Sequence, residues 1–485
     1  MTFDITQLIR ENTGRNYDLH REHINPQYAK VLKTIGFDRV HVRAQGPYLW
    51  DNQGRQYLDF IGGYAVTNVG RTHPTVKKAL MDFLAGDHPS MIHFEAPLLS
   101  GLLAEELKKR IGRGLDYVFF TNSGTEGVEC AIKYAKCATG KPAMVFCEKA
   151  FHGLSTGSLS LNGCESFRKG FAPFLPESRQ IPFNDLSALE AQLKRGDVAG
   201  FIVEPVQGKG VNLPAPGYLA KASALCGKYG ALFIVDEIQS GVGRCGTFLA
   251  IDAEEGFEND RGGNDGGPDI VILSKALSGG YVPVGAVLTH KAVYEKVYSS
   301  MERAIVHSST FHQNSMAMVA GLASLAALDE DDMIANGNRM GAKLREGIEG
   351  MMDRFALIKE VRQRGMMIGI EFGPPSLLKS PALRTAWSMI HTVDGNLFTQ
   401  AVVIPLMEDH LILTQVAGHN MDVLKLTPPL MISEADVKRF LSAFEDVMVK
   451  LHKFPGPTWE LMTRLGRNAF SKSKHSEAVM EAATS

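Results

Sequence analysis

The chain has 485 residues, of which 45% are hydrophobic and 21% charged, and its 51 basic residues nearly balance 53 acidic ones. The resulting formal charge of −2 lacks the basic excess of nucleic-acid-binding proteins, so we expect no nucleic-acid partner. A chain of this length can form two or more domains, each with a substantial core.

Cysteine usage and apolar stretches predict the compartment. The six cysteines include no Cys-x-x-Cys pair, which indicates a reducing compartment and argues against a disulfide framework or a metal site. Residues 1–10 carry an early acid and no apolar core of a signal peptide. The longest apolar stretch, Met316–Leu328, is too short to span a bilayer and predicts a buried helix. We therefore expect a cytoplasmic protein without a membrane partner.

The first half of the chain changes from a hairpin pattern to an α/β pattern. Helical patterning occurs around Gln27–Ile35, and Val40–Phe60 alternates apolar and polar residues around a turn at 51–54, which predicts a hairpin or meander. From His73 to Leu328, helical and strand patterns alternate, as in a mostly parallel sheet covered by helices. The predicted helices are Lys77–Leu84, Leu98–Arg110, Gly127–Thr139 and Gly217–Lys228, and the predicted strands are Tyr117–Phe120, Met144–Cys147, Phe201–Val203, Leu232–Val235 and Ile270–Leu273.

The second half predicts a smaller α+β domain. Its elements are the helix Asn336–Phe355, the strand Met366–Phe372 and the helices Ala382–Val393 and Glu434–Leu451. The polar, Gly-rich stretch Glu254–Gly267 predicts a surface loop. We divide the chain into an N-terminal arm with part of the small domain (1–75), a large domain (76–330), a small C-terminal domain (331–466) and a disordered tail (467–485).

Lys275 follows directly after an apolar, β-branched run of strand length and precedes a Gly pair. Ligands bind at the carboxyl ends of strands in a parallel sheet, so an amine placed there faces a bound molecule. In that setting Lys275 is a candidate Schiff-base lysine. The alternative is a solvated lysine after a core strand.

Asp236 ends another apolar run, Ala231–Val235, and Glu237 follows it. A carboxylate at the edge of a buried strand needs a cationic partner to offset its desolvation, and a pyridinium nitrogen would serve. A helix cap or a salt bridge is the alternative role. The 39 residues from Asp236 to Lys275 leave room for a crossover and the next strand.

Three further patterns bear on a ligand. Ser123 and Glu126 form a capping-box pattern after a strand, and free amides at a helix start favour a phosphate, although many helices with such caps bind nothing. Phe151-His152 lies in a loop after a strand, where the ring could stack on a heteroaromatic ligand or simply be buried. The Gly-x-Gly-x-x-Gly motif at 241–246 does not join a strand directly to a helix, which argues against a nicotinamide dehydrogenase.

Together these features make the chain similar to the class III aminotransferases, pyridoxal-phosphate enzymes of fold type I, from about residue 40 to 450. The resemblance implies an α/β fold with a large domain on a mostly parallel seven-stranded-type sheet, a smaller α+β domain, and pyridoxal 5′-phosphate as cofactor. It is carried by the ordered motifs Asn122-Ser-Gly-Thr-Glu126, Phe151-His-Gly153, Glu204-Pro-Val-Gln-Gly208, Asp236-Glu-Ile-Gln239, Gly243-Arg244-x-Gly246, Ser274-Lys275-Ala-Leu and Thr310-Phe-His-Gln-Asn314.

The resemblance also implies roles for single residues. Lys275 would bind the cofactor covalently and then carry the proton between the substrate carbon and the cofactor. Asp236 would keep the pyridine nitrogen protonated, and Gln239 would contact the ring hydroxyl. Phe151 would stack on the ring, with His152 beside it.

Further cofactor-binding residues follow from the same resemblance. They include Ser123 and Glu204, with Gly124 and Thr125 holding the phosphate at the helix start. Thr310 would reach the phosphate of the neighbouring subunit. Active sites shared in this way imply a homodimer or a dimer of dimers.

Two departures from the family pattern bear on the substrate. Amino-acid ω-aminotransferases of this class usually have a Glu where this chain has Lys209, and an Arg where it has Lys425. That Arg binds an α-carboxylate and pairs with the Glu when the other substrate is bound. With two cations the switch cannot form, and Lys lacks the planar fork of Arg, although Lys425 could still attract a carboxylate.

The sequence therefore predicts a pyridoxal-phosphate-dependent aminotransferase that moves an amino group between glutamate, alanine or a primary ω-amine and an aldehyde, ketone or 2-oxo acid. Tyr64, after Gly62-Gly63, resembles the segment that lines the family's substrate channel, so we expect it to contact substrate. The alternatives are an ornithine- or acetylornithine-type enzyme, an aminomutase or racemase of the same fold, and a binding protein that kept the fold without the cofactor.

Overall fold

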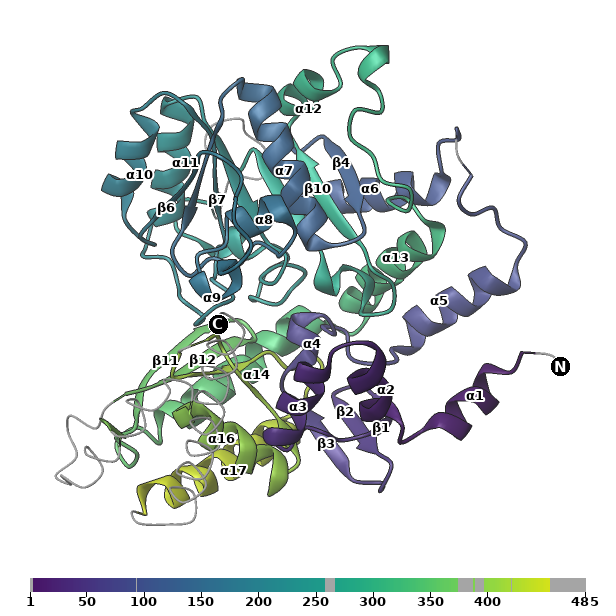
Figure 1. The fold of residues 1–485 in the computed structure, drawn as a ribbon, viewed down its shortest axis with the longest axis vertical. Coiled ribbons are helices and arrows are strands. Elements are labelled where there is room, and N and C mark those ends of the chain that lie inside the picture. Colours follow the sequence, from purple (N-terminus) through teal and green to yellow (C-terminus); the bar gives the residue numbers. More distant parts are fainter. Residues whose placement is uncertain are drawn as a thin grey trace, which may run out of the picture.

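A seven-stranded sheet forms the centre of the larger part of the molecule (Figure 1). The computed structural model describes residues 3–92, 94–257, 267–373, 387–388, 397–419 and 421–453. In spatial order the strands of this sheet are β4 (Tyr117–Thr121), β10 (Gly285–Thr289), β9 (Ile270–Leu273), β8 (Leu232–Asp236), β7 (Val198–Val203), β5 (Ala143–Cys147) and β6 (Ser178–Ile181).

The sheet is mostly parallel, as predicted, with β10 running against its neighbours. β10 pairs antiparallel with both β4 and β9, whereas the neighbours from β9 to β6 pair in parallel. Residues 274–284, which join β9 to β10, carry only the short helix η2 (Lys275–Ser278). That connection is too short for the crossover that a parallel strand requires, so the chain returns antiparallel. The sequence did not predict β10.

The strands are buried on both faces. In β8, Ile234 joins one apolar cluster, while Phe233 and Val235 join the other. This alternation is expected for a parallel sheet with helices on both sides. The first cluster includes residues of α7 (Gly124–Thr139), and the second includes residues of α5 (Pro74–Ala85), α6 (Leu98–Ile111), α11 (Tyr218–Lys228) and α13 (Ser315–Glu330).

Two smaller sheets lie beside the large one (Figure 1). The predicted hairpin around residues 51–54 is confirmed as the antiparallel pair of β2 and β3. The first small sheet has the order β1 (His41–Gln45), β2 (Tyr48–Asp51), β3 (Gln56–Asp59) and β13 (Ile412–Leu413), and the second has the order β11 (Ile358–Arg364), β12 (Met367–Phe372), β15 (Val423–Leu426) and β14 (Gln415–Val416). The first sheet thus joins N-terminal and C-terminal residues, while the predicted domain boundaries stay a prediction.

The C-terminal part adds three long helices, α14 (Met333–Glu349), α16 (Leu397–Glu408) and α17 (Glu434–His452). The other helices among the described residues are α1 (Ile5–Asn12), α2 (Asn16–His23), α3 (Pro26–Thr34), α4 (Gly62–Ala65), α8 (Thr156–Ser160), α9 (Glu165–Arg168), α10 (Leu186–Leu193), α12 (Lys291–Val297), η1 (Ala250–Ala253) and η3 (Met301–Arg303). The capping box of Ser433 and Asp436 fixes the start of α17.

The predicted elements within the described ranges are confirmed, with ends that shift by a few residues. The predicted apolar helix 316–328 is α13, which packs against α5, α6 and η2. Three predictions lie largely outside the described residues: the helix 382–393, of which only residues 387–388 are described, the tail 467–485, and most of the loop 254–267. Among the described helices, none combines the length and apolar composition needed to cross a membrane.

Candidate active site

The predicted site residues gather at the carboxyl edge of the large sheet. Asp236 is the last residue of β8, Lys275 follows β9 after one residue, and Glu204 follows β7 directly. His152 comes from the loop after β5, and its Nδ1 lies 2.7 Å from Oδ2 of Asp236. Because these strands are parallel, their ends meet at one edge, as the sequence predicted.

Lys275 is the first residue of η2 and has a left-handed backbone, with φ of 42°. Few residues other than glycine adopt this backbone conformation, and such strain is typical of functional positions. The preceding Ser274 donates its hydroxyl to the carbonyl of Val284 at 2.8 Å, which anchors the turn. Burial lowers the pKa of Lys275, and the carboxylates of Asp236 and Glu204 act in the opposite direction. A lysine with a lowered pKa is a better nucleophile and proton acceptor at neutral pH.

Asp236 and His152 form a buried ion pair. The second oxygen of Asp236 accepts the amide of Ile238 at 3.0 Å, so the carboxylate is fixed at both ends. Burial lowers the pKa of His152, but the hydrogen bond and charge of Asp236 outweigh this effect, and the net pKa is raised. The other ring nitrogen of His152, Nε2, is buried and has no hydrogen-bond partner in the described part of the chain.

The start of α7 offers unpaired amides to an anion. Ser123 is the N-cap, and its hydroxyl accepts the amide of Glu126 at 3.3 Å. The predicted capping box is only half formed, because the Glu126 carboxylate accepts the amide of Asn122 at 2.8 Å instead of that of Ser123. The amides of Gly124 and Thr125 have no acceptor within the helix. Together with the helix dipole, they favour a phosphate at this position.

Sequence reasoning missed two serines that complete this end of the site. The Thr125 hydroxyl lies 2.7 Å from that of Ser155 and 2.6 Å from that of Ser158. Both serines belong to the segment after Gly153, at the start of α8. Their signal in the sequence was the hydroxyl-rich stretch Ser155-Thr-Gly-Ser158, which begins two residues after the Phe-His-Gly motif.

Glu204 holds two loops together beneath the site. Its carboxylate accepts the amide of Phe151 at 3.1 Å and that of Gly208 at 2.9 Å. Burial raises the pKa of Glu204, while the nearby imidazole of His152 lowers it. Two neutral amide donors satisfy the buried carboxylate without a lysine or arginine.

Gln239 brings the predicted substrate residue to the same edge. Its Nε2 donates to the backbone carbonyl of Tyr64 at 3.0 Å. Tyr64 has φ of 63° within a kinked α4, and its side chain is exposed. Phe151 packs edge-on against Phe167, with ring centroids 5.5 Å apart, and sequence reasoning did not identify Phe167.

Lys209 and Lys425 both lie at the site but have different surroundings. The ammonium group of Lys209 lies over the rings of Phe167 and Phe151, 4.3 Å and 5.2 Å from their centroids. Lys425 is buried and donates to the carbonyl of Gly208 at 2.9 Å and to Oε1 of Gln239 at 3.4 Å. Burial, followed by the charges of Lys275 and Lys209, lowers the pKa of Lys425 to about 7.

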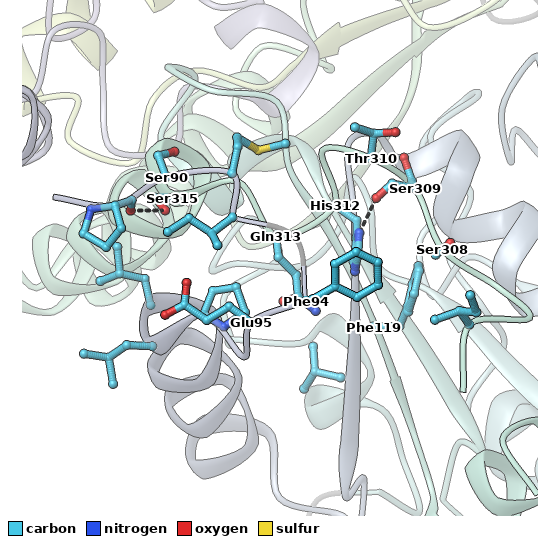
Figure 2. Close-up of a pocket in the computed structure, with 18 of the residues that line it drawn as sticks. Ser90, Phe94, Glu95, Phe119, Ser308, Ser309, Thr310, His312, Gln313 and Ser315 are labelled. Atoms are coloured by element: carbon cyan, nitrogen blue, oxygen red, sulfur yellow. Dashed lines mark hydrogen bonds between the residues drawn. The ribbon is translucent and has the colours of Figure 1, made fainter. Parts of the chain in front are cut away.

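Thr310 lies apart from the other predicted residues. It lines a cavity of about 990 Å³, together with Phe94 and Phe119 (Figure 2). Within the described residues, no hydrogen bond or ring contact joins Thr310 to the group around Lys275. The neighbouring Ser309 accepts Nδ2 of Asn122 at 3.0 Å, which links this segment to the start of α7.

The side chains at this edge fit the cofactor that the resemblance implies. Asp236 offers a carboxylate for a ring nitrogen, Lys275 a primary amine for a carbonyl carbon, and the start of α7 two unpaired amides for a phosphate. The buried and unpartnered Nε2 of His152 points to a further polar group nearby. A Cβ on Gly153 would lie only 2.4 Å from the Thr125 hydroxyl, so the glycine keeps the Phe-His-Gly loop close to the helix start.

Comparisons with known proteins agree with this chemistry. The profile of the family Aminotransferase class-III matches residues 33–448. Aminotransferase PigE from Serratia sp. is 33% identical over 481 residues, which cover 93% of this chain and 55% of that protein, so the chain spans about half the length of this relative.

Solved structures of similar fold include two amino-acid aminotransferases. The ornithine aminotransferase of Toxoplasma gondii, crystallised with partial occupancy of pyridoxal phosphate, has a TM-score of 0.78 at 27% identity and covers 93% of this chain and 100% of its own. The acetylornithine aminotransferase of Elizabethkingia anophelis has a TM-score of 0.66 at 26% identity, with 87% and 98% covered.

Proposed function

The chain belongs to the class III aminotransferases, which depend on pyridoxal 5′-phosphate, and from this premise we propose that its preferred amine substrates are primary amines without an α-carboxylate. The amino group would pass between such an amine, or glutamate or alanine, and an aldehyde, ketone or 2-oxo acid. An ornithine- or acetylornithine-type specificity is the second candidate, because two structural neighbours carry those names.

The surroundings of the two lysines support this substrate class. Lys425 donates to two acceptors of the chain itself, and Lys209 lies over two aromatic rings. Neither lysine forms an ion pair with a described acidic residue, so no switch between an acid and a cation is available. Nor does either present the two parallel N–H groups with which arginine holds a carboxylate.

The proposed mechanism assigns each residue of the edge one task. Asp236, held by His152, carries the negative charge that keeps a ring nitrogen protonated. When bound, pyridoxal phosphate accepts the electrons of the bond that breaks at the substrate carbon. The Nζ of Lys275 would take the proton from the substrate carbon and deliver it to the cofactor. Gln239 donates to the ring oxygen.

The remaining residues hold and cover the cofactor. The amides of Gly124 and Thr125 bind the phosphate at the start of α7, close to the cap residue Ser123. Phe151 would cover one face of the ring, and the hydrogen bond from its amide to Glu204 holds its backbone in place. The exposed ring of Tyr64, whose backbone carbonyl accepts a hydrogen bond from Gln239, would contact the substrate.

We also infer a homodimer. Thr310 lines a wide cavity that several exposed apolar side chains surround, among them Phe94 and Ile305. Monomeric proteins rarely expose such contiguous apolar surface. A second copy over this cavity would bring Thr310 to the phosphate of the partner's site.

The cytoplasm is our proposed location for this enzyme. All six cysteines are free, and four of them are buried. Free thiols persist in a reducing compartment, which supports the proposal.

The test of the substrate class is a half-reaction without keto acid. The holoenzyme is mixed with single amines in matched pairs, ornithine against putrescine and alanine against ethylamine, and conversion of the bound cofactor to its pyridoxamine form is followed by absorbance. We expect faster conversion by the carboxylate-free member of each pair. Conversion by ornithine and alanine alone would instead establish the amino-acid specificity. Release of a 2-oxo acid from glutamate or alanine distinguishes transfer from an aminomutase or racemase.

A further inference from the structure

Lys425 connects two sheets at the active site. It lies in β15, where it pairs with Gly369 of β12 and Gln415 of β14 in the second small sheet. Its side chain is only 5% exposed and reaches two loops at the carboxyl edge of the large sheet. One loop follows β7 and offers the carbonyl of Gly208, and the other follows β8 and offers Oε1 of Gln239.

The neighbours of Gln239 determine which way its amide faces. Lys425 carries an N–H in both its charged and its neutral form, and its Nζ donates to the atom assigned as the oxygen, Oε1. A backbone carbonyl is only an acceptor, so the atom beside Tyr64 must be the nitrogen, Nε2. Both contacts therefore fit the same orientation. One N–H of Nε2 is used by Tyr64, and the second meets no acceptor among the described residues.

Gly208 makes this approach possible. A Cβ at this position would lie 2.4 Å from Oε1 of Gln239, which is closer than any real contact. The same residue donates its amide to Glu204 and accepts the ammonium of Lys425. The two loops and β15 are thus held together by one buried set of hydrogen bonds.

We propose that Lys425 is a positioning residue, which fixes the Gln239 amide so that its free N–H faces the ring oxygen of the cofactor. In this arrangement Lys425 does not receive a substrate carboxylate. The inference rests on the proposed role of Gln239 at the ring oxygen. It deepens the proposed function because it gives Lys425 a role in cofactor binding and not in substrate recognition.

The test is a double-variant cycle on the full chain without amine. Wild type, Lys425→Met, Gln239→Ala and the double variant are titrated with pyridoxal phosphate, and the visible absorption of the bound cofactor is recorded across pH. We expect each single change to weaken binding about tenfold and to shift the absorption in the same direction. The double variant should match Gln239→Ala, because Lys425 acts through that residue.

Lys209→Met is the matched control, since it removes a neighbouring cation that packs on Phe151 and Phe167 and, within the described residues, forms no hydrogen bond with Gln239. Its effect should add to that of Gln239→Ala. Additive losses for Lys425→Met and Gln239→Ala would overturn the proposal. The proposal would also be overturned if Lys425→Met left the affinity for pyridoxal phosphate and the absorption spectrum unchanged but raised the KM for ornithine and not for putrescine. If the wild-type chain showed no visible absorption after titration with pyridoxal phosphate, the cofactor role of Gln239 would be overturned as well. The missing absorption of the wild type distinguishes this outcome from a failure of the Lys425 proposal alone.

Discussion

Lys275 combines a strained backbone with a half-buried amine whose pKa is lowered by burial and raised by the charges of Asp236 and Glu204. We predict that Lys275→Ala lowers the rate of amino transfer by about 10²–10⁴-fold, the range for a lost general acid–base group. The free energy of unfolding should change by less than about 1 kcal/mol, because removing a half-buried amine also removes the cost of its partial desolvation. Single-turnover absorbance and urea unfolding measure the two effects. Transamination at the wild-type rate would show that another group carries the proton.

The pair of His152 and Asp236 should make stability depend on pH. The pKa of His152 is raised in the folded protein, because Asp236 holds its proton. The pair therefore stabilises the fold fully below the ordinary histidine pKa of about 6.5, and this contribution is lost as pH rises through the folded value.

His152→Asn isolates this effect, since the amide keeps a donor near the position of Nδ1 but does not titrate in this range. The difference in free energy of unfolding between wild type and His152→Asn should be largest below about pH 6.5 and decrease at higher pH. Urea unfolding at several pH values measures it. A difference that stays constant with pH would mean that His152 does not change its charge in the folded state.

Single residues were predictable where a motif met the end of a strand. Asp236 and Lys275 follow apolar runs, so the rule that ligands bind at the carboxyl ends of parallel strands is enough to predict that both lie at one edge. The contact of Lys425 with Gln239 was not predictable, because it depends on how two separate sheets pack. For the same reason the sequence suggested only that Lys425 could attract a carboxylate.

At the scale of elements, the start of α7 packs against the loop that follows β8. A Cβ on Gly124 would lie 2.8–3.1 Å from three side-chain atoms of Ile238, which sits between Asp236 and Gln239. Gly124→Ala should therefore displace the β8 loop, lower the free energy of unfolding by about 1–3 kcal/mol and weaken pyridoxal phosphate binding.

Gly227→Ala is the control for this change, because a Cβ there meets nothing within 4 Å in α11. It should raise the free energy of unfolding by about 0.5–1 kcal/mol through helix propensity and leave cofactor binding unchanged. Urea unfolding and a pyridoxal phosphate titration separate the two variants. Equal behaviour of Gly124→Ala and Gly227→Ala would show that Ile238 moves aside freely.

Element types were predicted better than element connections. The Gly-rich motif at 241–246 forms turns, in agreement with the prediction that it is no strand-to-helix junction. The half-formed capping box shows the limit of such patterns. The Glu126 carboxylate can reach the amide of Asn122 or that of Ser123, and only the local backbone geometry determines that it accepts the amide of Asn122. Strand β10 escaped prediction because its short apolar run follows a Gly- and Pro-containing segment that reads as a loop.

At the scale of the whole molecule, the pairing of strands that are distant in the chain could not be predicted from the sequence. β13 has two residues and pairs in parallel with β3, more than 300 positions earlier, so no local pattern marks it. Five of the seven strands of the large sheet were predictable, because each is a continuous apolar run, whereas β6 and β10 were not.

If the cavity that Thr310 lines is covered by a second copy of the chain, a charge introduced beside it should disrupt the dimer. Ile305, beside the cavity that Thr310 lines, is exposed and apolar. Ile305→Glu should convert a dimer of the 53.0 kDa chain to a monomer in sedimentation experiments and weaken cofactor binding. Ala191→Glu adds the same charge to exposed α10, which lies away from α5 and α6 in Figure 1, and should leave the dimer intact. A monomeric wild type would contradict the proposal.

If Thr310 serves the site of the partner subunit, two defective chains should complement each other. In a dimer of one Lys275→Ala chain and one Thr310→Ala chain, one site carries both defects and the other carries neither. Co-expression with two affinity tags isolates this mixed dimer, and activity is measured at a pyridoxal phosphate concentration that saturates wild type but not Thr310→Ala. The mixed dimer should reach about half of the wild-type activity, because one of two sites is intact. If Thr310 acted within its own chain, each site would carry one defect, and the mixed dimer would have only the mean activity of the two parent variants.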